Sequence, residues 1–265
     1  MATKKTPSTA LVPWEKQFAA DAKKAVEQES TIGGGGQSVK FGAGGTITVA
    51  GATLPGNRLE CVILGACFEN GWYDTPYNPD DPQPPTCYAF GEAEKEMAPH
   101  PDCQQAQSDT CAGCPKNEYG SAAVGRGKEC GNKKRIALVT SADAQDLDVL
   151  ATVELATAKL SPTQLKAWAG YVRSLGELDK GPRPPWAVVT EITGFPDQKN
   201  QYRLEFRLVE TIDDPATLKV LKQRADKVQE FLQQPYGPPI VRDKKTAKRG
   251  AVGKSGKFVA KAGRR

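Results

Sequence analysis

The chain has 265 residues, of which 38% are hydrophobic and 25% charged, a balance that suits one large or two small globular domains. Its apolar runs, such as residues 61–67, are far shorter than the roughly 18 residues that a membrane-spanning helix needs. Composition therefore excludes a membrane-spanning protein. The single histidine, His100, argues against histidine-based catalysis and against histidine-rich metal sites.

Charge is distributed unevenly along the chain. The net charge is +5, but residues 242–265 hold ten Lys or Arg and one acid, so this segment alone carries +9 and the other 241 residues carry −4. A segment with so few large apolar side chains cannot bury enough surface to offset its ordering entropy. We therefore expect a disordered basic tail suited to a polyanion, with a plain solvated end as the alternative.

Hydrophobic periodicity predicts the secondary structure in chain order. A helix is expected at 13–29, with Trp14, Phe18, Ala22, Ala25 and Val26 near one face, followed by a glycine hinge at 33–36. Short alternating or β-branched segments predict strands at 38–41, 46–49, 59–68, 134–140, 150–155, 186–193 and 202–209. Further helices are expected at 161–175 and 215–233.

This order of elements predicts a mainly β (α+β) protein. Short strands, a helix before the last pair of strands and a closing hairpin favour a small antiparallel β-barrel, of which the oligonucleotide-binding (OB) barrel is the simplest match. An α+β sandwich would give much the same order. We expect an N-terminal arm at 1–36, an OB-like barrel with its C-terminal helix at 37–241 and the basic tail at 242–265.

The segment at about 74–132 interrupts this barrel. It is rich in proline and holds five of the seven cysteines, and a structureless loop of this length is unusual inside a compact domain. An odd number of cysteines without a secretory signal does not indicate a disulfide framework. Cys111 and Cys114 instead have the spacing of two thiolates that share one tetrahedral ion, and Cys130 is a third candidate ligand.

The fourth ligand is preferably Cys87, with Cys103 and then His100 as alternatives. Four cysteines would leave no open coordination position, so the predicted zinc ion is structural. An iron–sulfur cluster, or reduced thiols on an unstructured loop, are the other interpretations. Cys61 and Cys67 lie in an apolar run and are expected to be buried free thiols.

Binding of single-stranded nucleic acid without sequence preference needs cations and exposed aromatic rings. Both surround the cysteine-rich insertion. The candidate rings are Trp72, Tyr73, Tyr77, Tyr88, Phe90 and Tyr119, and the candidate cations are Lys116, Arg126, Lys128, Lys133, Lys134 and Arg135. Tyr88 and Phe90 alternatively close over the metal knuckle.

Several of these residues stand in a series of motifs. The series is Trp72-Tyr73, Pro84-Pro85-Thr86-Cys87-Tyr88-Ala89-Phe90, Cys111-x-x-Cys114-Pro-x-Asn117, Tyr119-Gly-Ser121, Gly125-Arg-Gly-Lys128-x-Cys130 and Arg135-Ile-Ala-Leu. It resembles a group of bacteriophage-encoded single-stranded-DNA-binding proteins with a cysteine cluster in an OB-type barrel, over about residues 46–209. The resemblance implies Cys87, Cys111, Cys114 and Cys130 as zinc ligands. Such proteins usually end in an acidic tail that recruits partner enzymes, whereas this chain ends in a basic one.

The expected function is therefore non-enzymatic binding of single-stranded DNA in phage replication or recombination, in the host cytoplasm, with phage replication proteins as further partners. The alternative is a zinc-containing interaction or regulatory module that docks on replication or transcription proteins. A nuclease would need clustered carboxylates for magnesium. Asp143, Asp146 and Asp148 are the dense acidic group near a strand, and a solvated turn explains them more simply.

Overall fold

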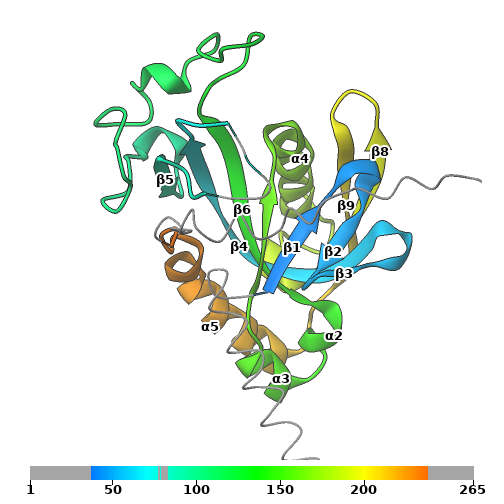
Figure 1. The fold of residues 1–265 in the computed structure, drawn as a ribbon. Helices are drawn as coiled ribbons and strands as arrows, with labels where there is room; N and C mark the ends of the chain where they lie inside the picture. Colours follow the sequence, from blue (N-terminus) through cyan, green and yellow to red (C-terminus); the bar gives the residue numbers. More distant parts are fainter. Residues whose placement is uncertain (1–36, 77, 79–82, 238–265) are drawn as a thin grey trace, which may run out of the picture.

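The computed structural model describes residues 37–76, 78 and 83–237 (Figure 1). The predicted arm with its helix and glycine hinge, Tyr77 and the predicted basic tail lie outside these residues. The predictions made for them remain predictions.

Within the described residues, nine strands form one sheet. They are β1 (Gln37–Phe41), β2 (Ile47–Val49), β3 (Ala52–Thr53), β4 (Arg58–Trp72), β5 (Cys87–Gly91), β6 (Gly131–Thr140), β7 (Ala156–Leu160), β8 (Val188–Asp197) and β9 (Gln201–Thr211). Their order is β3-β2-β1-β7-β6-β4-β8-β9, and β5 pairs with the second half of β4. The sheet curls into a half-barrel (Figure 1). The predicted mainly β class is confirmed, and the antiparallel prediction holds except between β1 and β7, which are parallel.

Four α-helices are described: α2 (Ser141–Ala144), α3 (Leu147–Thr152), α4 (Leu165–Gly176) and α5 (Pro215–Leu232). None of these helices has the length and apolar character to cross a membrane. The predicted helices at 161–175 and 215–233 are confirmed as α4 and α5. Pro215 at the first turn and the Asp214 carboxylate, which accepts from the Thr217 N–H, fix the start of α5.

Each face of the curled sheet carries its own core, because side chains alternate along every strand. On the face called here the α4 face, Ile136 and Leu138 pack with Trp168 and Tyr171 of α4. On the opposite face, the α5 face, Ala137 and Val139 pack with Leu221, Val228 and Leu232 of α5 and with α2 and α3. The predicted burial of Cys61 and Cys67 is confirmed, since neither has exposed surface.

The predicted strand at 150–155 is wrong. Residues 147–152 form α3, whose first turn is capped by the Asp146 carboxylate, the acceptor for the N–H groups of Asp148 and Val149. A side-chain acceptor at the N-cap stabilises a helix start, and it outweighed the apolar run that indicated a strand. The strand that follows is β7, which begins four residues after the end of α3.

The open side of the half-barrel is narrowed where the β1–β2 turn meets β8. A Cβ atom on Gly194 would lie 1.9 Å from the carbonyl oxygen of Gly45, so the two backbones meet without side chains between them. The rings of Phe41 and Tyr202 lie 6.4 Å apart on the same side. Tyr202 and Phe206 pack against the α4-face core, as their strand parity predicts.

Candidate metal centre and nucleic-acid interface

The second half of β4 is the base of the cysteine-rich insertion. It pairs with β5 on one side and β6 on the other, with Trp72 opposite Cys87 and Gly71 opposite Gly131. Cys87 is therefore the first residue of β5, and Cys130 immediately precedes β6. Strand pairing alone brings these two cysteines, 43 positions apart, to either side of one strand end.

The other two predicted ligands lie on a turn held by backbone and amide hydrogen bonds. Asn117 donates from Nδ2 to the Cys111 carbonyl (2.8 Å) and from its backbone N–H to the Cys114 carbonyl (2.9 Å). The Cys130 N–H donates to the Lys116 carbonyl at 2.8 Å. These bonds tie the turn to the start of β6, so strand pairing and this turn together place all four cysteines.

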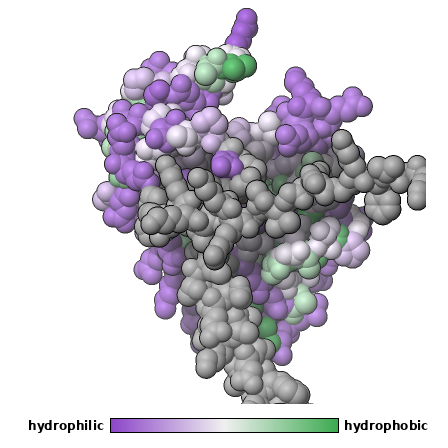
Figure 2. Space-filling model, in the orientation of Figure 1, coloured by the Kyte–Doolittle hydropathy of each residue, from purple (hydrophilic) through white to green (hydrophobic). Residues whose placement is uncertain are grey.

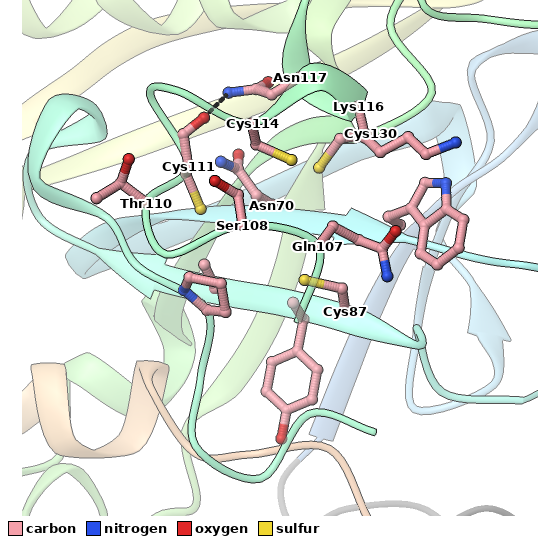
Figure 3. A pocket seen from close by; sticks show the side chains of 14 residues that line it. Asn70, Cys87, Gln107, Ser108, Thr110, Cys111, Cys114, Lys116, Asn117 and Cys130 are labelled. Carbon is pink, nitrogen blue, oxygen red and sulfur yellow. Dashed lines mark hydrogen bonds between the residues drawn. The ribbon is translucent and has the colours of Figure 1, made fainter. Parts of the chain in front are cut away.

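The four cysteines line one cavity (Figure 3). Its volume is about 20 Å³, which is room for one water-sized group. All are free thiols; Cys111 and Cys114 are buried, whereas Cys87 and Cys130 are half-buried. Among the described residues, no three His, Cys, Asp or Glu side chains are arranged closely enough to hold a metal ion as they stand. The sulfurs would therefore have to draw inward to bind one.

The chemistry around the sulfurs fits a metal–thiolate group. The Asn70 amide nitrogen Nδ2 is buried and has no hydrogen-bond partner of normal geometry among the described residues, and it lies beside the Cys111 thiol, whose pKa it acts to lower. Backbone N–H groups of Gln107 and Gly71 act in the same direction on Cys87 and Cys130. N–H donors directed at sulfur stabilise thiolates, the form that binds metals.

Without a cation, burial keeps the thiols of Cys87, Cys111 and Cys130 protonated. Burial raises the pKa of Cys87 to about 11 and that of Cys130 to about 12, and the neighbouring cysteines add to both shifts. The pKa of Cys111 is raised for the same main reason. A divalent cation reverses this balance by pairing with the negative charges.

The alternative ligands have different positions. Cys103 is close to Cys87, because the two thiols interact directly, but it does not line the cavity. His100 is turned away: its ring stacks on Tyr88 at 5.2 Å, and its Nδ1 accepts from the Asp102 N–H at 3.1 Å. Cys87 remains the preferred fourth ligand on position.

Aromatic and cationic side chains are paired beside the cavity. Lys116 lies 5.2 Å from the centre of the Trp72 ring and forms a 2.6 Å ion pair with Glu129, which also accepts from the Trp72 indole N–H at 3.1 Å. Lys128 lies 4.9 Å from the centre of the Tyr119 ring. Trp72 is half-buried, whereas Tyr119 is 84% exposed, so Tyr119 offers the most accessible ring among the predicted rings that the structure describes.

The outer end of the insertion projects from the body. Val124 is 89% exposed and Arg126 is exposed, and Figure 2 shows an apolar patch at the end of this projection among hydrophilic residues. Tyr73 is also exposed. Nearer the sheet, Lys133 is half-buried and Lys134 lies 3.7 Å from the centre of the Phe68 ring on the α4 face.

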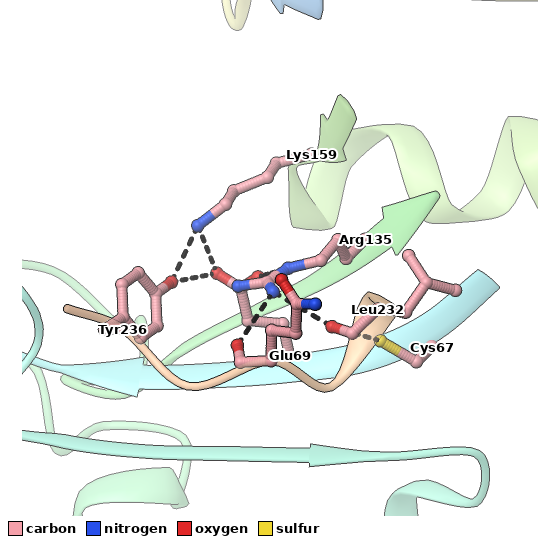
Figure 4. Close-up of polar contacts among 7 residues, drawn as sticks. Cys67, Glu69, Arg135, Lys159, Leu232 and Tyr236 are labelled. Atoms are coloured by element: carbon pink, nitrogen blue, oxygen red, sulfur yellow. Dashed lines mark hydrogen bonds and ion pairs between the residues drawn. The ribbon is translucent and has the colours of Figure 1, made fainter. Parts of the chain in front are cut away.

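Arg135 does not belong to this surface, which corrects its predicted role in binding nucleic acid. On the α5 face, its Nε donates to the Glu69 carboxylate at 2.7 Å, and Lys159 Nζ lies 2.7 Å from the other oxygen of Glu69 (Figure 4). The Tyr236 hydroxyl donates to the same oxygen as Lys159, at 2.5 Å. Arg135 is buried because it neutralises Glu69, which is only 2% exposed.

Tyr88 and Phe90 need a similar correction. They project from β5 to the α5 face, where Tyr88 is only 3% exposed. The Tyr88 and Tyr236 ring centres are 4.9 Å apart, and the Arg135 guanidinium lies 4.4 Å from the centre of the Phe90 ring. Tyr88 has no open ring face for a base, and both rings stabilise the interior next to the insertion.

Two of the three acids of the nuclease interpretation take part in helix capping. Asp146 caps α3, and the Asp143 carboxylate accepts from the Thr140 hydroxyl at 2.6 Å, while the Asp143 N–H donates back to that hydroxyl. These bonds occupy the carboxylates of Asp143 and Asp146 with local structure.

An asparagine network was missed by the sequence analysis. Asn132 Nδ2 donates to the side-chain oxygens of Asn70 (2.7 Å) and Asn117 (2.9 Å), which links β4, β6 and the cysteine turn. Asn117 stands in the Cys-Pro-x-Asn motif, but Asn70 and Asn132 carry no comparable signal, since only strand pairing brings them together.

Comparison of the chain with protein-family models, curated protein sequences and solved structures finds no match.

Proposed function

We propose that the chain binds single-stranded DNA without enzymatic activity, on the side of the insertion formed by residues 115–134, and that a zinc ion held by Cys87, Cys111, Cys114 and Cys130 stabilises this side. The observation that carries the proposal is that these four cysteines, from three parts of the chain, line one cavity beside the Trp72–Lys116 and Tyr119–Lys128 pairs. Stacking rings next to cations are what single strands require.

Charge separates within the insertion in a way that supports this choice of side. Without the buried Arg135, residues 115–134 hold five bases and two acids, a net charge of +3, whereas residues 83–114 hold one lysine and five acids, a net charge of −4. A phosphate backbone is attracted to the first part and repelled by the second. The DNA path is therefore assigned to residues 115–134 rather than to the whole insertion.

The strand pairings support an OB-like arrangement. In an OB barrel the first strand pairs with the second and the fourth, a helix precedes the fourth, and the fourth and fifth form a hairpin. The strands β4, β6, β7, β8 and β9, with α4 before β8, have these pairings. The arrangement departs from an OB barrel at one place. In an OB barrel the fifth strand, here β9, would pair with the third, here β7, and close the barrel; in this structure β1 takes that place beside β7.

This correspondence assigns the cysteine-rich insertion to the connection between the first and second barrel strands, and the β8–β9 turn to the connection between the fourth and fifth. Those two connections contact oligonucleotides in OB proteins. The β8–β9 hairpin also carries an aromatic–cation pair, with the Arg203 guanidinium 4.5 Å from the centre of the Phe195 ring. Figure 1 places the insertion and this hairpin as two projections of the same side of the molecule.

When bound, zinc supplies a structural crosslink among four thiolates. The residues of the chain do the rest: Asn70, Gln107 and Gly71 direct N–H groups at the sulfurs, and the asparagine network fixes the turn to β4 and β6. This holds Tyr119 and Lys128 on a firm base, which reduces the entropy lost when they bind a strand.

Fluorescence anisotropy with a labelled oligo-dT strand tests the binding. Tyr119→Ala should weaken binding about 5- to 150-fold, the equivalent of about 1–3 kcal/mol of stacking. Arg126→Gln should make the log–log slope of affinity against salt about 0.7 less steep. The matched control, Lys95→Gln in the acidic part, should leave both quantities unchanged.

Wild-type protein that fails to bind oligo-dT at low salt would refute the DNA proposal. Deletion of residues 242–265 separates the affinity that comes from the basic tail from the affinity that comes from the insertion. Some binding should remain after the deletion, because the aromatic rings lie in the insertion. Metal analysis of the purified protein should give one zinc ion per chain. Iron together with sulfide would show that the four cysteines hold an iron–sulfur cluster and not zinc. The absence of any metal would refute the metal proposal but not the DNA proposal.

One observation favours the interaction module as a second candidate. The exposed end of the insertion combines the apolar side chain of Val124 with Tyr119, a composition found at protein interfaces as well as at stacking surfaces. The module predicts no DNA binding once the tail is deleted, together with capture of a replication protein that is lost in Cys111→Ser and Cys114→Ser variants.

A further inference from the structure

A groove opens between α3 and α5, on the α5 face and away from the cysteine site. Its volume is about 410 Å³. Its apolar lining includes Leu155, Val220 and Phe231, which are half-buried, and Ala151, which is exposed. Accessible apolar side chains on two neighbouring helices and on the segment after α3 form the kind of surface that accepts the apolar face of a third helix.

Two cations stand in this groove without a carboxylate partner among the described residues. Arg224 donates to the carbonyl oxygens of Leu150 and Val153, and burial lowers its pKa. Lys227 also lines the groove and is exposed. An occupant with acidic residues beside its apolar face would complement both.

The described chain begins next to the groove. Gln37, the first residue of β1, is paired with Ala156 of β7, and Ala156 follows Leu155, which lines the groove. In Figure 1 this end of β1 points toward the part of the molecule that contains α3 and α5. The residues that precede Gln37 therefore start within reach of the groove.

Residues 13–29 have the pattern that the groove requires. On a helix of 3.6 residues per turn, Trp14, Phe18, Ala22 and Ala25 share one face, and the acids Glu15 and Asp21 border it. The lysines at 16, 23 and 24 lie on the opposite side. The seven residues at 30–36, four of them glycine, span at most about 25 Å when extended, which is comparable with the length of a 17-residue helix.

We propose that residues 13–29 dock as a helix in the α3–α5 groove of the same chain, with Trp14 and Phe18 against its apolar lining and with Asp21 and Glu15 facing Arg224 and Lys227. Burial of the two large rings would provide most of the driving force, and the ion pairs at the rim would set the orientation. The proposal is independent of metal and DNA binding.

Hydrogen–deuterium exchange on the full-length protein tests the docking. In Phe18→Asp, peptides that cover residues 147–155 and 216–231 should exchange at least fivefold faster than in the wild type, while β4 and β6 should be unchanged. Lys23→Glu, on the opposite face of the predicted helix, is the matched control and should exchange like the wild type. A second pair tests the orientation: Lys227→Glu should also speed exchange, and Asp21→Lys added to it should restore protection.

Three outcomes would overturn the proposal. Unchanged exchange of the groove peptides in Phe18→Asp would show that the segment does not cover them. Failure of Asp21→Lys to rescue Lys227→Glu would remove the assigned orientation. Protection that grows with protein concentration, together with a dimer mass in light scattering, would assign the groove to the arm of a second copy.

Discussion

Replacing Glu69 by glutamine keeps the shape of the side chain but removes the charge that pairs with Arg135 and Lys159. In the wild type, one carboxylate oxygen accepts from Arg135 Nε at 2.7 Å, and the other accepts from Lys159 at 2.7 Å and from the Tyr236 hydroxyl at 2.5 Å. An amide offers only one acceptor oxygen and turns two donors toward these cations. The variant therefore loses charge and hydrogen bonds together.

The size of the effect depends on which cation can reach water. The Arg135 side chain is 11% exposed and the Lys159 side chain 42% exposed, so Lys159 can turn to solvent whereas Arg135 stays buried. Breaking a buried pair costs about 3–5 kcal/mol. Because only one of the two cations is left buried and unpaired, we expect Glu69→Gln to lower the free energy of unfolding by about 3 kcal/mol.

The loss depends on pH in a defined direction. Burial acts to raise the pKa of Glu69, but the charges of Lys159 and Arg135 outweigh it, so its pKa is lowered in the folded state. A carboxyl group with a lowered folded pKa stabilises the protein fully above its unfolded pKa of about 4.3 and loses that contribution as the pH falls through the folded value. The difference between wild type and variant should be constant from pH 7 to about pH 5 and shrink below about pH 4.

Urea unfolding at pH 7, followed by circular dichroism, measures the free energy. The control is Glu205→Gln, which removes the exposed ion pair with Arg203, with both side chains about half exposed, and should change stability by less than about 1 kcal/mol. Glu69→Leu combined with Arg135→Met should be less destabilised than the sum of the two single variants. A loss below about 1 kcal/mol in Glu69→Gln would refute the assignment of a buried, energetically coupled pair.

Three further predictions concern packing and the cysteine site. Gly194→Ala should destabilise the fold by more than about 2 kcal/mol in urea unfolding, since its Cβ would overlap the Gly45 carbonyl. The control is Gly170→Ala on α4, where a Cβ atom meets open space, and it should stabilise the fold by up to about 1 kcal/mol. Equal effects of the two substitutions would contradict the close approach of Gly194 to Gly45. In thermal unfolding, Leu138→Ala in the α4-face core should lower the stability of the fold by about 2–5 kcal/mol, because it leaves a cavity at a fully buried position. Val124→Ala, at the exposed end of the insertion, should change the stability very little. Similar losses of stability in the two variants would contradict the observed burial of Leu138. A chelator should speed proteolysis within residues 92–130 and leave the sheet intact, whereas unchanged cleavage would show that the insertion needs no metal.

Much of the fold follows from local patterns. Alternation in 202–209 and helical spacing in 161–175 predict β9 and α4, because both elements bury one face on a core that the periodicity reveals. The spacing of Cys111 and Cys114 is also a local signal, and it predicts that these two cysteines share one turn. Cys87 and Cys130 reach the same cavity only through the pairing of β4 with β5 and β6. The apolar pattern at 150–155 gave a wrong prediction of a strand, because the Asp146 carboxylate caps a helix that begins just before it.

The remaining features depend on pairing between distant segments. Arg135 is a cation in a basic stretch, and only its pairing with β4 and the return of Tyr236 after α5 show that it faces a buried carboxylate. Tyr88 and Phe90 likewise change from candidate stacking rings to interior residues once strand parity on β5 is fixed. Sequence alone gives the residue types of a site, but the face to which each one points depends on registers set elsewhere.

The register of β4 explains why the insertion is held from both sides of the sheet. Glu69 and Asn70 are adjacent, so strand alternation sends one to the α5 face and the other to the α4 face. Glu69 binds Arg135 of β6 and Lys159 of β7, while Asn70 binds Asn132 of β6 and lies beside the Cys111 thiol. Both residues thus fasten β4 to β6 at the base of the cysteine-rich insertion. A single-residue slip of β4 would exchange the two faces, placing a carboxylate among the sulfurs and an amide among the cations, so the ion cluster and the cysteine cavity specify the same register.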